Sequence, residues 1–236
     1  MTPYYEDGIV TLYLGDSLEV LPELDLHGVV SCVVTDPPYI LGAASASSLS
    51  GKTGSWADAM NSSYWFSNWY KLVDRALTHE GLFWSFLNWR TMPVVMRAAI
   101  DARLAITSMA VWDKQWIGPG GSQGLRPSYE MIALLAQPGA AIPNRGIPDL
   151  ISIPSGGGYK PNGHPAEKPV AVKRRLIEIS GIVPGALVLD PFIGSGTTAL
   201  AARDMGCRCI GIEADEKWLE VAAKRLSQDD LFGGTA

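Results

Sequence analysis

The chain is poor in cysteine and histidine and has no long hydrophobic run. Its cysteines, Cys32, Cys207 and Cys209, include no Cys-x-x-Cys pair, which argues against a disulfide framework and predicts buried, reduced thiols. The few histidines are widely spaced, so we expect no metal. No stretch approaches the roughly 18 consecutive apolar residues of a membrane span, and the N-terminus does not resemble a signal peptide. We therefore expect a cytoplasmic protein without a membrane partner.

Basic residues are outnumbered, since the net charge is -5, and this at first disfavours a nucleic-acid partner. The charge is uneven, however. Residues 90–175 contain eleven basic and five acidic residues and carry +6, which leaves -11 for the remainder. This segment either forms a basic face for a polyanion or reflects chance clustering on a solvated surface.

Short apolar runs alternate with helix-like segments along the chain. Seven runs predict strands: Thr11–Asp16, Val29–Asp36, Leu82–Trp89, Ala105–Asp113, Tyr129–Gln137, Ala186–Phe192 and Arg208–Glu213. Five segments predict helices: Tyr64–Thr78, Pro93–Ala102, Pro169–Ser180, Thr197–Gly206 and Glu216–Leu226. The alternation is typical of a single α/β domain, residues 1–236, in which helices cover both faces of a mostly parallel sheet. The irregular spacing from Leu82 to Gln137 predicts an antiparallel edge.

Two segments lack any periodicity. Residues Ile40–Ser63 are dense in Gly, Ala and Ser and predict a mobile loop. Residues Pro138–His164 are rich in Pro and Gly and predict an extended insertion rather than a second domain.

The segment ALVLDPFIGSGTT is typical of a nucleotide-type pocket, because an apolar strand runs into a Gly-rich turn and then a helix. Gly194 and Gly196 allow close approach of the backbone to a ligand, and the helix start near Thr197 offers N–H groups. Glu213 follows seventeen residues after Gly196, where a carboxylate would accept from ribose hydroxyls. The turn alone could be a tight connection that binds nothing, and it does not distinguish NAD from S-adenosylmethionine.

The segment VVSCVVTDPPY places an acidic residue and two prolines just beyond a strand, where open parallel sheets keep their active sites. An exocyclic base amine is a poor nucleophile, so a site that methylates it must accept its hydrogens. Asp36 and the carbonyl of Pro37 are suitable acceptors, Pro38 stiffens the backbone, and Tyr39 offers a stacking face for a base. Taken alone, the tetrapeptide is equally consistent with an ordinary Asp-Pro turn.

Together, TDPPY near the N-terminus and DPFIGSGTT near the C-terminus resemble the amino-methylating DNA methyltransferases, in the circularly permuted β group whose catalytic motif precedes the cofactor motif. The resemblance covers nearly all of residues 12–226. It implies a Rossmann-like, seven-stranded fold and S-adenosylmethionine as cofactor. It also implies a cofactor site formed by Asp16, Lys168, Asp190, Pro191, Phe192, Gly194, Ser195, Gly196, Thr197 and Glu213. Within it, Asp16 would lie near the adenine and Lys168 near the methionine carboxylate, although Asp16 could instead cap a helix and Lys168 could be a surface residue.

The resemblance further implies double-stranded DNA as partner and a target-recognition region at about 138–164, which is short. Candidate DNA contacts are Lys114, Arg126, Arg145 and Lys160, and Trp112 and Glu130 are expected on the same side. Members of the group often form homodimers, and a dimer would offset the overall acidity. Whether a restriction endonuclease accompanies the protein, and whether its host is a bacterium or a phage, stays open.

The expected function is transfer of a methyl group to adenine N6 in DNA. The closest alternative is methylation of cytosine N4, because an initial Asp in the tetrapeptide leans towards adenine without requiring it. A nucleotide-dependent oxidoreductase would also use the Gly-rich turn and Glu213, but would not explain DPPY. An inactive DNA-binding module is the remaining alternative.

Overall fold

A computed structural model describes residues 1–38, 56–118, 124–156, 162–164 and 166–232, with the backbone alone at 56–62 and 229–232. Tyr39, Lys160 and residues 40–55 of the expected loop lie outside the described residues. The helices are α1 Ser17–Glu23, α2 Trp56–Ala76, α3 Met92–Asp101, α4 Val170–Ser180, α5 Thr197–Asp204 and α6 Glu216–Phe232. In the described part of the chain, none of them is long and apolar enough to cross a membrane.

One mixed sheet organises the domain. Its strands are β1 Tyr5–Glu6, β2 Val10–Leu14, β3 Val30–Thr35, β4 Leu77–Leu87, β5 Ala105–Asp113, β6 Tyr129–Ala136, β7 Leu150–Ser152, β8 Leu187–Asp190 and β9 Arg208–Glu213. They lie in the order β1-β2-β9-β8-β3-β4-β6-β5-β7. The run from β2 to β4 is parallel, while β6 is antiparallel to both β4 and β5. This confirms the predicted mostly parallel sheet and its antiparallel part.

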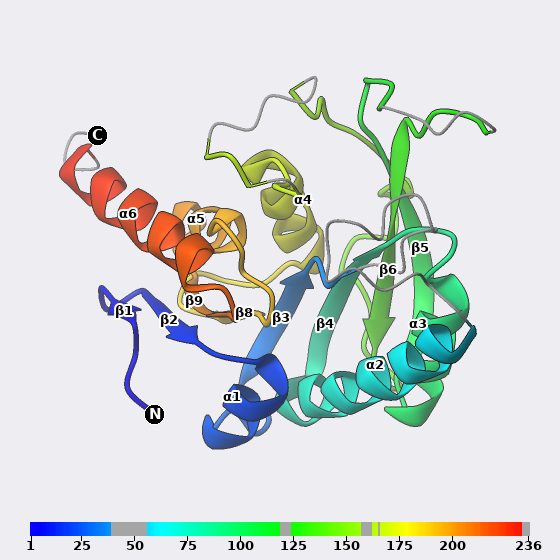
Figure 1. Cartoon of the computed structure of the whole chain (residues 1–236), viewed down its shortest axis with the longest axis horizontal. Helices are drawn as coiled ribbons and strands as arrows, with labels where there is room; N and C mark the ends of the chain where they lie inside the picture. Colours follow the sequence, from blue (N-terminus) through cyan, green and yellow to red (C-terminus); the bar gives the residue numbers. More distant parts are fainter. Residues whose placement is uncertain (39–55, 119–123, 157–161, 165, 233–236) are drawn as a thin grey trace.

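Helices cover both faces of the sheet, with α1, α2 and α3 on one side and α4, α5 and α6 on the other (Figure 1). The alternation of side chains in β3 shows why: Val33 faces the first set of helices, whereas Cys32 and Val34 face the second. Both faces of the central strands are therefore apolar, as expected for a buried parallel sheet.

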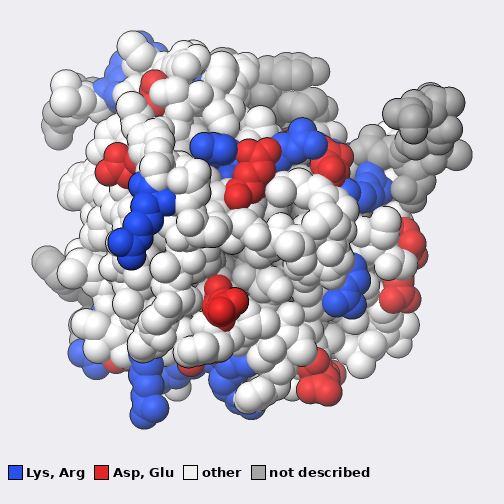
Figure 2. All heavy atoms as spheres, turned by 180° about the vertical axis from the view of Figure 1, so that it is seen from behind, with Lys and Arg blue, Asp and Glu red and all other residues white. Residues whose placement is uncertain are grey.

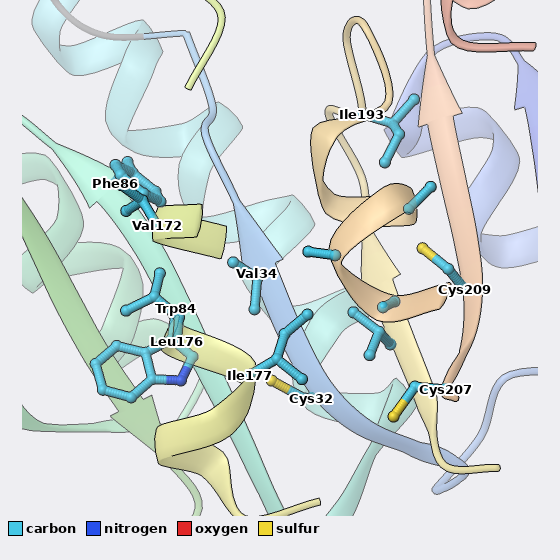
Figure 3. Close-up of a cluster of buried hydrophobic side chains, with 14 of the residues drawn as sticks. Cys32, Val34, Trp84, Phe86, Val172, Leu176, Ile177, Ile193, Cys207 and Cys209 are labelled. Carbon is cyan, nitrogen blue, oxygen red and sulfur yellow. The ribbon is translucent and has the colours of Figure 1, made fainter. Parts of the chain in front are cut away.

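Close packing between α4 and the central strands stabilises the second face. Figure 3 shows Leu176 and Ile177 of α4 directed towards β3 and β4, where Trp84 is buried. The indole N–H of Trp84 donates to Ser180 at the end of α4, at 2.8 Å, so this buried polar atom is satisfied. Cys32, Cys207 and Cys209 are all free and buried, as predicted.

The structure differs from the predicted organisation in several details, among them the start of β4 at Leu77 rather than at Leu82. The described residues form nine strands rather than seven, because β1 and β7 each add a very short strand at an edge of the sheet. Strand β7, parallel to β5, lies inside the segment expected to be an extended insertion. Helix α2 begins at Trp56, so residues 56–63 are helical rather than part of a loop. Two- and three-residue strands are too short to show a periodic pattern, and neighbouring strands supply the hydrogen bonds that define them.

Candidate active site

The sheet register brings the two motifs together. Strands β3 and β8 are parallel neighbours, with Val33 paired to Leu189. Beyond this pair, the hydroxyl of Thr35 at the end of β3 donates to the carboxylate of Asp190 at the end of β8, at 2.6 Å. The proposed catalytic motif and the Gly-rich turn therefore leave the same edge of the sheet side by side, although they are far apart in sequence.

Asp190 is the buried centre of this junction, with 1% of the residue exposed. Its carboxylate accepts hydrogen bonds from the hydroxyls of Thr35, at 2.6 Å, and Thr198, at 2.5 Å. It also accepts from the backbone N–H of Phe192, and the buried ammonium of Lys173 lies 3.6 Å away. These contacts join residues of β3, α4, β8 and α5. Asp190 therefore holds the DPPY motif and the Gly-rich turn in place and faces the protein interior.

The Gly-rich turn adopts a conformation that favours glycine. Gly194 has φ of 52° and Gly196 has φ of 84°, both in the left-handed region, and Gly196 directly precedes α5. A Cβ at Gly196 would come within 3.0 Å of the Cβ of Ala222 in α6, and one at Gly194 within 3.3 Å of the His164 ring. The turn is thus tightly enclosed, with the N-terminus of α5 directly beyond it.

Glu213 ends β9, the next strand, and its side chain reaches the turn. It accepts from the backbone N–H of Gly194 at 2.9 Å and from that of Asp215 at 3.0 Å. Burial raises the pKa of the Glu213 carboxyl above its ordinary value, although these N–H groups lower it in part. Each carboxylate oxygen can accept more than one hydrogen bond, so Glu213 is fixed in position while keeping acceptor capacity.

Asp16 is the N-cap of α1, where its side chain accepts from the backbone N–H of Leu18 at 2.8 Å. The capping alternative is therefore observed. The neighbouring Ser17 is buried, and its hydroxyl donates to the carbonyl of Pro191. This contact brings the start of α1 against the Gly-rich turn, so the exposed Asp16 also lies at the rim of the same site.

Lys168 links the DPPY motif to β6 through buried ion pairs. Its ammonium lies 2.5 Å from Asp36 and 3.2 Å from Glu130, and Lys114 lies 2.7 Å from Glu130. The Lys168 side chain is only 7% exposed, so the alternative of a surface lysine is wrong. The result is a chain of alternating charges from Asp36 to Lys114.

The mutual attraction of these charges sets their protonation. Burial alone would raise the pKa of Glu130, but Lys168 and Lys114 lower it to about 2. Burial would likewise lower the pKa of Lys168, whereas the carboxylates of Asp36 and Glu130 raise it above the ordinary value. Lys168 therefore stays cationic and Glu130 stays anionic throughout the neutral range.

The structure places the residues expected to contact DNA in different environments. Lys114 is occupied by Glu130, and Trp112 is 2% exposed in the core, which contradicts its expected place on the DNA side. Arg126 is exposed but donates to the carbonyls of Ile117 and Gly118, and Arg145 is exposed. On the face shown in Figure 2, basic side chains are scattered among acidic ones, without one broad basic patch.

Sequence reasoning missed several residues at the site, including His164 and Arg225. The His164 ring packs edge-on against Trp218, with centroids 4.4 Å apart, and borders Gly194. Arg225 of α6 donates to the carbonyl of Ser195 at 2.6 Å. His164 directly precedes the segment that carries Lys168, which could have pointed to it, but nothing in the sequence singles out Arg225. Among the described residues, no group of His, Cys, Asp and Glu side chains is arranged to hold a metal ion.

The chain matches the family model described as DNA methylase, for N6 and N4 methyltransferases, over residues 30–146 and 146–224. Both the catalytic motif and the Gly-rich turn lie inside the matched ranges. This match favours methyl transfer over the oxidoreductase alternative.

Individual proteins give the same result. "Putative methylase YubD" of Escherichia coli K12 is 33% identical over 220 residues, covering 90% of this chain and 88% of the relative. The type II methyltransferase M.ScaI of Streptomyces caespitosus is 27% identical, with 96% and 84% covered. The PvuII cytosine-N4-specific DNA methyltransferase shares the fold, with a TM-score of 0.78 at 19% identity, covering 94% of this chain and 88% of that chain. A structure of M1.HpyAVI with SAM has a TM-score of 0.72 at 21% identity, with 92% and 99% covered. Motifs, register and relatives agree: the chain belongs to the N6/N4 DNA methylase family, whose members are amino-methylating, S-adenosylmethionine-dependent DNA methyltransferases.

Proposed function

We propose that the protein transfers a methyl group from S-adenosylmethionine to the N6 amine of adenine in double-stranded DNA at a specific sequence. The observation that carries this proposal is the pairing of β3 with β8, which sets Asp36 beside the Gly-rich turn. A base amine held by Asp36 would then face a cofactor held by the turn. The initial Asp of the DPPY motif supports adenine over cytosine.

The residues around the turn fit S-adenosylmethionine. The Gly-rich turn directly precedes the N-terminus of α5, whose free N–H groups suit a ligand, and Glu213 keeps acceptor capacity for ribose hydroxyls. Asp16 at the rim would accept from the adenine amine, and Lys168, already paired with Asp36 and Glu130, would lie near the methionine carboxylate. Asp190 would act by holding the turn, since its oxygens are occupied by Thr35, Thr198 and Phe192. The cofactor supplies a methyl group already activated on a sulfonium, so no covalent intermediate with the protein is needed.

The chain's own residues prepare the amine. The carboxylate of Asp36 and the carbonyl of Pro37 accept its two hydrogens, which favours a pyramidal nitrogen with an available lone pair. Pro37 and Pro38 have no N–H groups and a fixed φ, so they hold this carbonyl rigidly without competing donors. Lys168 orients Asp36 through the ion pair seen in the structure. Positioning of this kind supplies most of the acceleration, and a strong general base is unnecessary because the amine proton is lost after transfer.

The target base must leave the helix to reach this site, because a stacked base cannot approach the cofactor. We propose that it is flipped out and stacked on Tyr39. Sequence recognition would involve the short 138–164 segment, including Arg145 and Lys160, together with Arg126 and a second subunit in a homodimer. The match to type II methyltransferases supports a role in restriction and modification.

One experiment decides which base is methylated. Unmethylated plasmid DNA would be incubated with the protein and S-adenosylmethionine, digested to nucleosides and analysed by mass spectrometry. N6-methyladenine is expected. N4-methylcytosine would establish the alternative, which the same arrangement of acceptors would serve, and the absence of both would overturn the proposed function. Sequencing the plasmid for modified positions would reveal the recognition sequence.

Replacing Glu213 by glutamine is expected to weaken S-adenosylmethionine binding by about 10- to 100-fold, because hydrogen bonds to a charged acceptor contribute roughly 1.5–3 kcal/mol. The wild-type affinity should also fall with decreasing pH. Since the pKa of Glu213 is raised, the carboxylate takes up its proton at a higher pH than an ordinary glutamate, and acceptor strength is lost there. Calorimetric titration of both proteins between pH 4 and pH 8 measures both effects. A wild-type affinity without pH dependence, equal to that of the variant, would contradict the assigned role.

A further inference from the structure

Trp89 and Arg90 form an exposed pair that the proposed mechanism does not use. Trp89 is 62% exposed, whereas the tryptophans of the adjacent sheet, Trp84 and Trp112, are 3% and 2% exposed. The guanidinium of Arg90 lies 4.4 Å from the centroid of the Trp89 ring. Trp89 therefore lies next to a cation and exposes most of its surface to solvent. It is not part of the hydrophobic core.

A short, well-bonded turn presents this pair. Asn88 accepts from both the backbone N–H of Thr91, at 2.9 Å, and the Thr91 hydroxyl, at 3.0 Å. Thr91 is fully buried and precedes α3. The backbone on either side of Trp89 and Arg90 is thus fixed, which limits the conformational entropy lost when the pair meets a partner.

The turn lies at the same edge of the sheet as the active site. Strands β3 and β4 are parallel neighbours, with Thr35 paired to Ser85, so both end at this edge. Position 89 is four residues beyond Ser85 and Asp36 is one residue beyond Thr35, so Trp89 lies at most about 10 Å further along the strand direction than Asp36. At about 3.4 Å per base pair, this is within about three base pairs of a target base at Asp36. Tyr129, 46% exposed, begins the neighbouring β6.

We propose that Trp89 and Arg90 contact the DNA beside the flipped nucleotide: Trp89 stacks on a base face that flipping exposes, and Arg90 binds a phosphate. The proposal rests on the proposed function, because it requires DNA at this edge. An exposed indole with a cation on one side provides a π-face for a base and a positive charge for the backbone. This contact adds one cation and one aromatic face for DNA at the edge of the sheet that carries Asp36.

The test uses the full-length protein, the plasmid above and a fluorescent 40-base-pair duplex carrying the recognised sequence. Trp89→Ala should raise the KM for DNA and the Kd for the duplex by about 5- to 150-fold, the range expected for loss of one stacking contact. The KM for S-adenosylmethionine should not change. Trp89→Phe should restore most of the affinity, and Arg90→Gln should reduce the dependence of log Kd on log salt by about one. Ile100→Ala is the matched control, because Ile100 is 71% exposed at the far end of α3.

The possible outcomes distinguish failure of this DNA contact from failure of the proposed function. Unchanged DNA affinity and KM in Trp89→Ala, or a loss equal to that in Ile100→Ala, overturn the DNA contact while the methyltransferase assignment stands. A change in sedimentation from dimer to monomer, with unchanged affinity of the monomer for DNA, also overturns it and assigns the pair to a subunit interface. If the wild type methylates no base, a random duplex replaces the recognised one: a Trp89-dependent Kd supports the contact, and no binding overturns it.

Discussion

Replacement of Asp36 by alanine is expected to lower kcat for methyl transfer by about 10²- to 10³-fold, the effect typical of removing one preorganised group that stabilises a transition state. In the proposed mechanism, the Asp36 carboxylate favours the pyramidal amine only as the transition state forms. The KM for DNA should therefore change much less than kcat. Initial rates of tritiated methyl incorporation measure both parameters.

The fold of this variant should survive, since Lys168 keeps Glu130 as a partner at 3.2 Å when Asp36 is removed. Circular dichroism and calorimetric titration with S-adenosylmethionine would establish that the site is still formed. Asp36→Asn keeps the size and one acceptor oxygen but removes the charge, so an intermediate rate is expected. A folded Asp36→Ala protein with the wild-type rate would exclude Asp36 from the chemistry.

The sequence predicts the fold well where its patterns are long. Strands such as β5 and β9 carry apolar side chains over at least six residues and agree with the prediction at both ends. The misjudged start of α2 has a physical cause: residues 56–63, WADAMNSS, follow a Gly- and Ser-rich stretch and have a weak apolar pattern, so nothing marks a helix start. Tertiary context determines such boundaries more than local propensity does.

The predicted local backbone around the candidate site agrees with the structure, whereas the sequence does not predict the side-chain partners. A Gly-rich turn between strand and helix follows from local sequence, and the left-handed φ angles at Gly194 and Gly196 agree with it. The ion pairs of Lys168 with Asp36 and Glu130 join residues 132 and 38 positions apart in sequence. Only the sheet order reveals such contacts, since β6 inserts between β4 and β5. For the same reason, Lys114 could not be recognised beforehand as the partner of Glu130.

The stability of the fold should depend strongly on the buried carboxylate of Asp190. Asp190→Ala is expected to lower the free energy of unfolding by about 3–5 kcal/mol, because it leaves the buried ammonium of Lys173 without its counter-charge. It also removes the acceptor of two buried hydroxyls, those of Thr35 and Thr198. Urea unfolding followed by circular dichroism measures the change, and the Gly-rich turn should lose its order together with cofactor binding.

A matched control lies on the neighbouring surface, where α4 and α5 are joined by an exposed ion pair between Arg174 and Asp204 at 3.5 Å. Asp204→Ala should change stability by only about 0–1 kcal/mol, since water screens this pair. If Asp190→Ala does not fold, Asp190→Asn keeps one acceptor and should show a smaller loss. Adding Lys173→Met to either variant removes the orphaned charge and should recover part of the stability. If it recovers none, the hydrogen bonds to Thr35 and Thr198, rather than the ion pair, hold the two motifs together.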